Sequence, residues 1–132
     1  MDELEFYKKA WNTVKQISID RGYTFSNDYN LISNTDFKFL ISEKKLDLIS
    51  TKNNFKNILY AKFLIYSKVK PSTVKEVVNE INESFEQKEI NNLEILLILR
   101  LKPNNSILKL EKELPNNLQI MWCKQLQFNI TK

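Results

Sequence analysis

The sequence predicts an α/β fold in which a mixed sheet is flanked by helices. Two apolar runs, residues 59–66 and 93–101, have the length and composition of strands that are buried on both faces. Between them, residues 72–88 repeat apolar side chains at helical spacing. Because a helix of this length is typical of the crossover between strands of one sheet, these three segments define the centre of the expected fold.

The first element is expected to be a helix over residues 2–21. Its apolar side chains recur at three- and four-residue steps and so form one stripe. They are Leu4, Tyr7, Trp11, Val14 and Ile17. Acidic residues in the first turn suit the helix dipole, and Gly22 is the expected left-handed stop. Trp11 is therefore expected in the core.

The segment between this helix and the first central strand is less regular. Residues 24–35 are rich in Asn, Ser and Asp and indicate a loop with at most one helical turn. The apolar cluster at 37–41 is compatible with a strand or a short helix. Residues 46–51 alternate in a way that predicts a strand, and residues 52–54 end it.

The helix over residues 72–88 is the clearest in the chain. Thr73 and Glu76 have the spacing of a capping box, and the charged face opposite the apolar stripe is expected to be solvated. The apolar stripe consists of Val74, Val77, Val78, Ile81 and Phe85.

The strand over residues 93–101 is expected to present a polar loop, residues 103–106, at its carboxyl end. Ser106 is the predicted N-cap of a short helix that begins with Ile107. Residues 113–117 are expected to end this helix and form another loop. Residues 118–130 should add one or two extended segments to the sheet. A rigid strand with a polar loop at its end is a suitable platform for contacting a ligand.

The composition argues against several chemistries. Without His, a Ser-His-Asp or Cys-His arrangement cannot be built, and one Gly is too few for phosphate-cradling loops. The single Cys123 lies beside Met121 and Trp122, which indicates a buried filler rather than a nucleophile. We find neither a signal peptide nor an apolar run of the roughly 20 residues that a membrane span needs.

The charge balance permits a nucleic-acid partner. Net charge is +4 and the pI is about 9.1, with Arg only at positions 21 and 100. Lys acts as a point charge that suits phosphates, whereas reading of base edges more often uses Arg. If DNA is bound, contact without sequence preference is therefore expected.

Several short strings, taken in order, carry a resemblance to a known family. They are TVK at 13–15, DRGY at 20–23, DFK at 36–38, Ser106 with Lys109, and LQFNIT at 126–131. Together they resemble the amino-terminal jaw domain of the fifth subunit of eukaryotic DNA-dependent RNA polymerases.

The resemblance implies a restriction-endonuclease-like jaw domain without catalysis, cofactor, metal or small-molecule substrate of its own. It implies docking on a large catalytic subunit and non-specific support of downstream double-stranded DNA. The family carries TPSA in the DNA-facing loop; here Asn104 and Asn105 stand in place of Thr and Pro, and Pro103 comes two residues earlier. The DNA-contacting residues expected from this alignment are Lys102, Asn104, Asn105, Ser106 and Lys109.

The family continues into a carboxyl-terminal assembly domain, which is not expected here, so residues 1–132 are interpreted as a single jaw-like domain. With the AT-rich bias of the composition, this looks like the small subunit of a minimal polymerase of a DNA virus or a cytoplasmic linear plasmid. The resemblance thus implies a cytoplasmic location, with a nuclear one as the alternative.

Two other functions remain open. A Mg²⁺-dependent nuclease of the same fold would need carboxylates on adjacent strands and a nearby Lys. Asp36 and Lys38 have the acid–x–Lys spacing, with Asp47 as the only candidate second acid, while Tyr60 stands where an acid would precede Lys62. A protein-interaction scaffold is the other alternative, and it differs from a DNA-binding protein by its weak dependence on salt.

Overall fold

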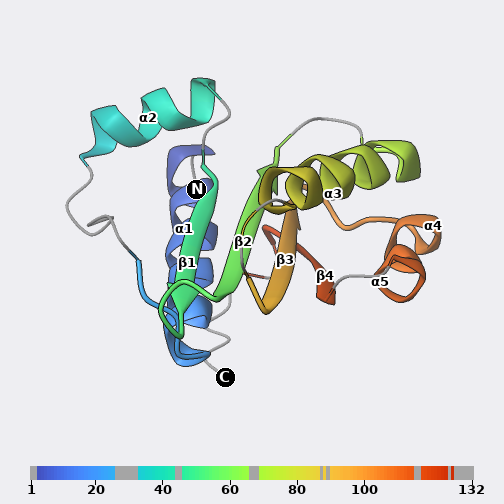
Figure 1. Ribbon diagram of the computed structural model, residues 1–132. Coiled ribbons are helices and arrows are strands. Elements are labelled where there is room, and N and C mark those ends of the chain that lie inside the picture. The colour runs from blue at the N-terminus through green and yellow to red at the C-terminus, as the bar shows by residue number, and fades with distance from the viewer. Residues whose placement is uncertain are drawn as a thin grey trace.

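The computed structural model describes residues 3–25, 33–43, 46–65, 69–86, 88, 90–114, 117–124 and 126. Helices and strands are interspersed along this part of the chain (Figure 1). They are α1 (Glu3–Asp20), α2 (Asn34–Ser42), β1 (Leu48–Lys52), β2 (Asn57–Leu64), α3 (Pro71–Phe85), β3 (Asn92–Leu99), α4 (Asn105–Leu108), α5 (Leu110–Glu113) and β4 (Asn117–Trp122).

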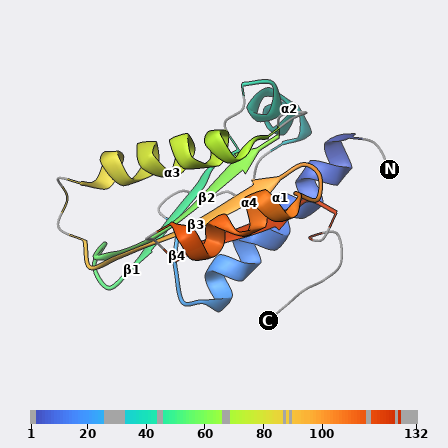
Figure 2. The same cartoon turned by 90° about the vertical axis from the view of Figure 1, so that its right-hand side faces the viewer.

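The strands form one sheet in the order β1-β2-β3-β4. β1 pairs with β2 in the antiparallel sense, whereas the β2–β3 and β3–β4 pairs are parallel. Figure 2 shows α3 and α1 on opposite sides of the sheet, and Figure 1 shows α4 and α5 on the side of α3. The predicted α/β fold, a mixed sheet flanked by helices, is confirmed.

β3 lies at the centre of the core, and all residues from Ile95 to Leu99 are buried. Side chains alternate along a strand, so Leu96 and Ile98 pack towards α1 and α2. The other three buried residues pack towards α3; they are Ile95, Leu97 and Leu99. The strand ends at Leu99, two residues earlier than expected. In the predicted final segment 118–130, residues 125 and 127–130 lie outside the described residues.

Trp11 is part of the core, as expected, and only 2% of its surface is exposed. Its indole nitrogen donates to the Leu46 carbonyl at 3.0 Å, and its ring meets Phe37 edge-on with the centroids 5.2 Å apart. Phe37 belongs to α2, so the cluster at 37–41 is a short helix and the alternative of a strand is wrong. Ser33 begins this helix by accepting a hydrogen bond from the Asp36 amide.

The start of α3 differs from the prediction. Pro71 occupies the first turn, where its missing N–H costs nothing, so the helix begins before Thr73. Thr73 is consequently not the cap: its hydroxyl accepts from the Lys70 amide at 3.4 Å from within the helix. The helix ends at Phe85, three residues short of the predicted limit.

The β1–β2 turn has an unusual backbone. Asn53, Asn54 and Phe55 have φ angles of 56°, 57° and 67°, and the turn closes through a hydrogen bond from the Lys56 amide to the Asn53 carbonyl. Asn adopts this left-handed conformation more readily than other non-glycine residues, whereas a bulky side chain there costs about 1–2 kcal/mol. The break predicted at residues 52–54 is present but starts one residue later, because Lys52 still belongs to β1. No sequence signal indicated a strained Phe55.

Both outer strands of the sheet are partly occupied along their free sides. On β1, Thr51 exchanges two backbone hydrogen bonds of 2.9 Å with Thr24. On β4, the Ile120 amide donates to the Glu111 carboxylate at 2.6 Å. Among the described residues, no helix is long and apolar enough to cross a membrane.

Candidate nucleic-acid interface

The loop after β3, residues 100–104, is held at both ends. At its start, the Cys123 amide donates to the Leu99 carbonyl at 2.8 Å, which ties the end of β3 to the chain after β4. Near its end Pro103 is buried, and the Asn104 side chain accepts from the Ile107 amide at 3.1 Å. The loop therefore passes into α4 with little freedom, as a binding platform requires.

The capping bond corrects one prediction. Asn104, not Ser106, is the N-cap of α4, and Ser106 lies inside the helix. Both residue types cap helices well, so their order along the chain could not decide between them.

The structure brings the five predicted DNA-contacting residues together on the loop and on α4. All of them are exposed: Lys102, Asn104, Asn105, Ser106 and Lys109. The ammonium of Lys102 lies 5.9 Å from the centre of the Trp122 ring, so its aliphatic part runs over β4 before the charge reaches solvent. Polar groups and cations arranged in this way can contact phosphates without reading bases.

Further cations come from the neighbouring strand ends. β2, β3 and β4 are parallel, so their carboxyl ends meet at one end of the sheet, here called the carboxyl end. α3 begins near this end (Figure 2), and the exposed Lys70 directly precedes it. The exposed Lys124 follows β4. The sequence analysis missed these two residues, which the parallel order of the strands could have indicated.

Arg100 also lies at the carboxyl end but faces partly inward. Burial raises the pKa of the Tyr7 phenol, and the Arg100 guanidinium, which is hydrogen-bonded to it, opposes that rise. Burial also raises the pKa of the Cys123 thiol to about 12, again against the influence of Arg100. Cys123 is fully buried, so the prediction of a buried filler is confirmed.

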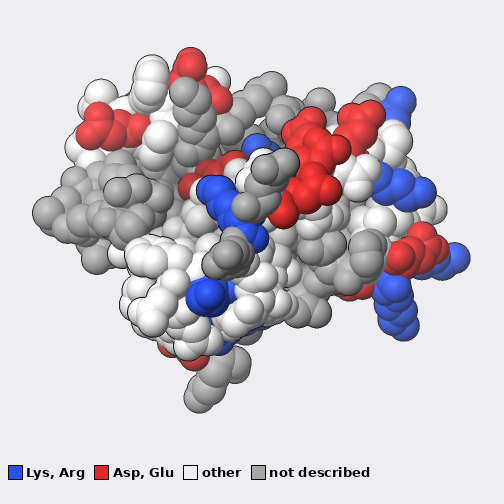
Figure 3. Space-filling view, viewed as in Figure 1, with Lys and Arg blue, Asp and Glu red and all other residues white. Residues whose placement is uncertain are grey.

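Acidic residues restrict where a nucleic acid could lie. The outer face of α3 carries four exposed carboxylates, which gather in red over this helix in Figure 3. They are Glu76, Glu80, Glu83 and Glu86. Glu3 and Glu5 are exposed at the start of α1. These charges repel phosphates from α3 and from the start of α1. The β3–α4 loop and α4 carry no acidic residue, although the exposed Glu113 follows in α5.

The residues considered for a nuclease are not arranged as that activity requires. Asp36 lies in the first turn of α2 and is exposed, so it does not belong to the sheet. Asp47, just before β1, accepts hydrogen bonds from the Tyr60 hydroxyl at 2.9 Å and the Lys62 ammonium at 3.0 Å. Burial and the Asp47 carboxylate raise the pKa of the Tyr60 phenol. The described residues contain no group of three His, Cys, Asp or Glu side chains that could hold a metal ion.

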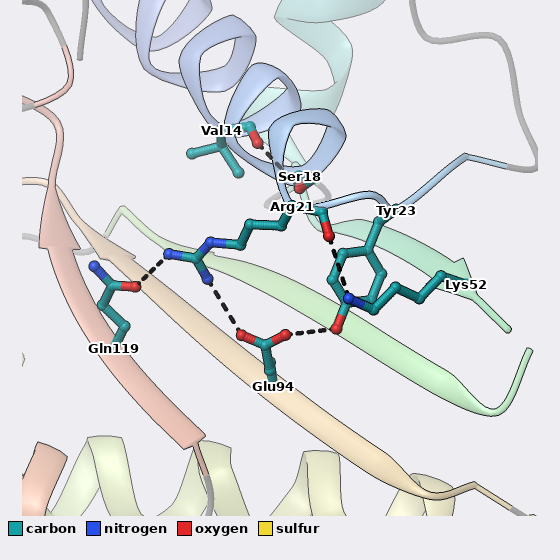
Figure 4. A network of polar contacts seen from close by, with 7 residues as sticks. All are labelled: Val14, Ser18, Arg21, Tyr23, Lys52, Glu94 and Gln119. Carbon is teal, nitrogen blue, oxygen red and sulfur yellow. Dashed lines mark hydrogen bonds and ion pairs between the residues drawn. The ribbon is translucent and has the colours of Figure 1, made fainter. Parts of the chain in front are cut away.

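The DRGY string forms part of a polar cluster at the other end of the sheet, here called the amino end (Figure 4). Gly22 has a φ of 91°, and this left-handed turn ends α1 as predicted, so that Arg21 and Tyr23 both reach Glu94 on β3. Arg21 donates to Glu94 at 3.3 Å and to Gln119 on β4 at 2.8 Å. We call Arg21, Tyr23, Lys52, Glu94 and Gln119 the Glu94 cluster.

The other strings of the resemblance also serve internal contacts where they are described. Thr13 of TVK donates to the Leu126 carbonyl at 2.9 Å, and the Lys15 ammonium lies 4.4 Å from the centre of the Trp11 ring. The NIT string at 129–131 lies outside the described residues. Thr13 and the DRGY string thus join α1 to the sheet and to the chain after β4.

Comparison with known proteins gives no relative from which a function could be transferred. No protein-family model matches the chain, and no curated protein sequence matches it.

Proposed function

We propose that this chain is a non-catalytic accessory subunit of a DNA-dependent RNA polymerase, docked on the large catalytic subunit and supporting downstream duplex DNA. The proposal rests on the resemblance of the strings described above and on one structural observation. This is the anchored β3–α4 loop and the helix that follows it, where Lys102, Asn104, Asn105, Ser106 and Lys109 are all exposed. The proposed enzyme is the minimal polymerase of a DNA virus or a cytoplasmic linear plasmid, and the proposed location is the cytoplasm.

The kind of contact follows from the side chains. Lys102 and Lys109 supply mobile point charges, and Asn105 and Ser106 supply short hydrogen-bonding groups, all suited to phosphate oxygens. Arg100, whose guanidinium could read a guanine, is engaged with Tyr7. The chain is therefore proposed to hold DNA of any sequence.

Binding of a fluorescent duplex, followed by anisotropy over a range of salt concentrations, tests the DNA contact. We expect equal affinity for two duplexes of unrelated sequence, and a steep fall in affinity with salt. Lys102→Glu together with Lys109→Glu should lower the slope of log affinity against log salt by roughly two, about one for each phosphate that is no longer neutralised. Lys75→Glu, an exposed Lys on the acidic face of α3, is the matched control and should change little.

Unchanged binding by the double variant would show that the loop is not the contact. Binding that is insensitive to salt would favour the scaffold instead. Mg²⁺-dependent cleavage of the duplex, abolished by Asp47→Ala, would favour the nuclease. Co-purification with a large polymerase subunit from the native source tests the assembly itself.

A further inference from the structure

The turn at the tip of the β1–β2 hairpin, residues 53–56, carries backbone strain at an exposed aromatic residue. Phe55 has a φ of 67°, a conformation that bulky side chains rarely adopt. The residue is 67% exposed, more than any other large apolar residue in the described part of the chain. Burial of the ring therefore does not offset the strain, and backbone strain of this kind clusters at ligand-binding sites.

A polar hollow of about 450 Å³ lies beside Phe55. Its lining includes two hydroxyl-bearing residues, Thr24 and Thr51, and the exposed Asn53 and Asn54. A carboxamide offers a hydrogen-bond donor and an acceptor side by side, and a threonine hydroxyl can act as either. The hollow has the size of a small-molecule site, and its lining suits a ligand with several polar groups.

The frame of the hollow is held from two sides. The Lys52 ammonium donates to the Arg21 carbonyl at 3.2 Å and lies 4.5 Å from the centre of the Tyr23 ring (Figure 4). The Asn91 amide donates to the Lys56 carbonyl at 2.6 Å, which joins the tip to the chain entering β3. A frame that is already ordered loses little freedom when a ligand binds.

The charges around the hollow favour a ligand that carries a phosphate. The hairpin, residues 48–64, contains no Asp or Glu. Glu94, the carboxylate of the neighbouring cluster, is held by Arg21 and Tyr23. Lys56 is exposed next to Phe55. The hollow thus combines uncharged polar groups with a cation at its edge.

An exposed aromatic ring, carboxamides and a cation at the edge together match the chemistry of a nucleobase with its phosphate. Unpaired bases stack on exposed aromatic side chains, and the edge of a base can pair with the donor and acceptor of a carboxamide. A lysine beside the stacked base suits the phosphate. In a duplex the faces of the bases are covered by their neighbours, so such a site takes unpaired bases only.

The hollow lies away from the loop that is proposed to contact duplex DNA. The Lys52–Asn57 pair closes the hairpin beside Asn92, the first residue of β3, while the loop follows Leu99 at the other end of the strand. Eight strand residues separate the two by about 26 Å, at roughly 3.3 Å per residue. Binding at the two places can therefore be measured independently.

We propose that the hollow at the hairpin tip binds an unpaired nucleobase, which stacks on Phe55 with its edge at Asn53 and Asn54 and its phosphate at Lys56. The base belongs to a single-stranded nucleic acid or to a free nucleotide, which offer the same chemistry to the hollow. This site goes beyond the proposed function and does not depend on it.

Fluorescence anisotropy of the full chain with a short labelled single-stranded oligonucleotide tests the site, with adenosine monophosphate as competitor in a second arm. Phe55→Asn removes the ring and fits the left-handed backbone, whereas Phe55→Trp keeps an aromatic surface. We expect Phe55→Asn to weaken single-strand binding about five-fold or more, as loss of one stacked base does, and Phe55→Trp to retain it. Duplex binding should not change in either variant.

A fluorescent base analogue in the strand tests contact with the base itself. Its emission should change on binding to the wild type, because stacking on Phe55 alters its surroundings. Asn54→Gly suits the left-handed backbone, removes one carboxamide and should weaken binding several-fold. Phe39→Asn, which alters a 60% exposed Phe on α2, is the matched control and should bind the strand like the wild type.

The outcomes are distinct. Competition by adenosine monophosphate would support the site with a free nucleotide as a sufficient ligand, and strand binding without such competition would support it with the strand as the source. Equal strand binding by the wild type and Phe55→Asn, or unchanged emission of the analogue, overturns the site. An equal loss in Phe55→Trp, or a lowered thermal midpoint of Phe55→Asn, also overturns it, because stacking would then not be the role of Phe55. Displacement of the strand by glucose would overturn a base as the occupant.

Discussion

At the amino end of the sheet, Arg21 and Lys52 turn inward onto Glu94 and the Tyr23 ring, whereas at the carboxyl end Lys102 and Lys109 extend into solvent. The inward cations are held by acceptors from distant parts of the chain: Glu94 is 73 residues from Arg21. The outward ones stand on a loop fixed by other residues, Pro103 and Asn104. The same type of charged group thus stabilises the fold at one end and is available for a partner at the other.

Removing Glu94 should have the largest effect on stability, and the effect should be confined to the amino end of the sheet. Glu94→Ala leaves the Arg21 guanidinium and the Tyr23 hydroxyl without their shared acceptor in a half-buried site, so we expect the free energy of unfolding to fall by about 2–3 kcal/mol. Urea denaturation measures this. Duplex affinity of the folded variant should equal that of the wild type, since the change is at the amino end.

Glu113→Ala is the control for this prediction, because Glu113 is exposed at the end of α5. Its removal should change the free energy of unfolding by less than about 0.5 kcal/mol. Equal destabilisation by the two substitutions would contradict a structural role for the Glu94 cluster.

Removing the cap of α4 should have a smaller effect and should act at the other end of the sheet. Asn104→Ala is expected to lower the free energy of unfolding by about 1 kcal/mol, because the Ile107 amide loses its acceptor. Since the cap orders the loop that is proposed to contact DNA, duplex affinity should also fall several-fold in the anisotropy assay. Ser106→Ala should leave stability nearly unchanged; a larger cost for Ser106 than for Asn104 would reverse the assignment of the cap.

The smallest effect is expected from alkaline pH. Burial, with the hydrogen bond to Glu94, raises the pKa of the Tyr23 phenol above its ordinary value of 10.0. The folded protein therefore keeps a proton that the unfolded chain releases, so this stabilisation is complete below pH 10 and is lost as the pH rises further. At pH 10.5 the loss should be about 0.8 kcal/mol, measured by urea denaturation.

Tyr23→Phe removes the ionisable group and should flatten this part of the pH profile relative to the wild type. Identical slopes above pH 10 in the two proteins would show that Tyr23 does not retain its proton in the folded state.

The elements of the fold that depend on local patterns could be predicted from the sequence. The stripe that includes Val74, Val78 and Ile81 predicts α3, and the uninterrupted apolar run of β3 predicts its central place in the sheet. The short cluster at 37–41 could not be assigned locally, because a run of this length suits either a helix or a strand. In the structure this segment is helical, and its Phe37 packs on Trp11 of α1, a contact between residues distant in sequence.

The candidate site was predictable in composition but not in detail. Lys102 and Lys109 stand out as cations around a turn, whereas the choice of Asn104 over Ser106 as cap depends on where the loop enters α4. Contacts such as Arg21 with Glu94 join residues far apart in sequence, and no local signal pairs them. The left-handed Phe55 had no signal either, because only its two Asn neighbours are usual in such turns.

The hydrogen bonds between Glu111 and β4 and between Thr24 and β1 also affect self-association of the chain through its sheet edges. Each occupies a backbone group that a strand from another molecule would otherwise pair with, and such pairing is the first step of fibre growth. A carboxylate near the free side of β4 adds a charge that an incoming strand would have to bury. Lengthening of the sheet is therefore disfavoured at Thr51 on one side and at Ile120 on the other.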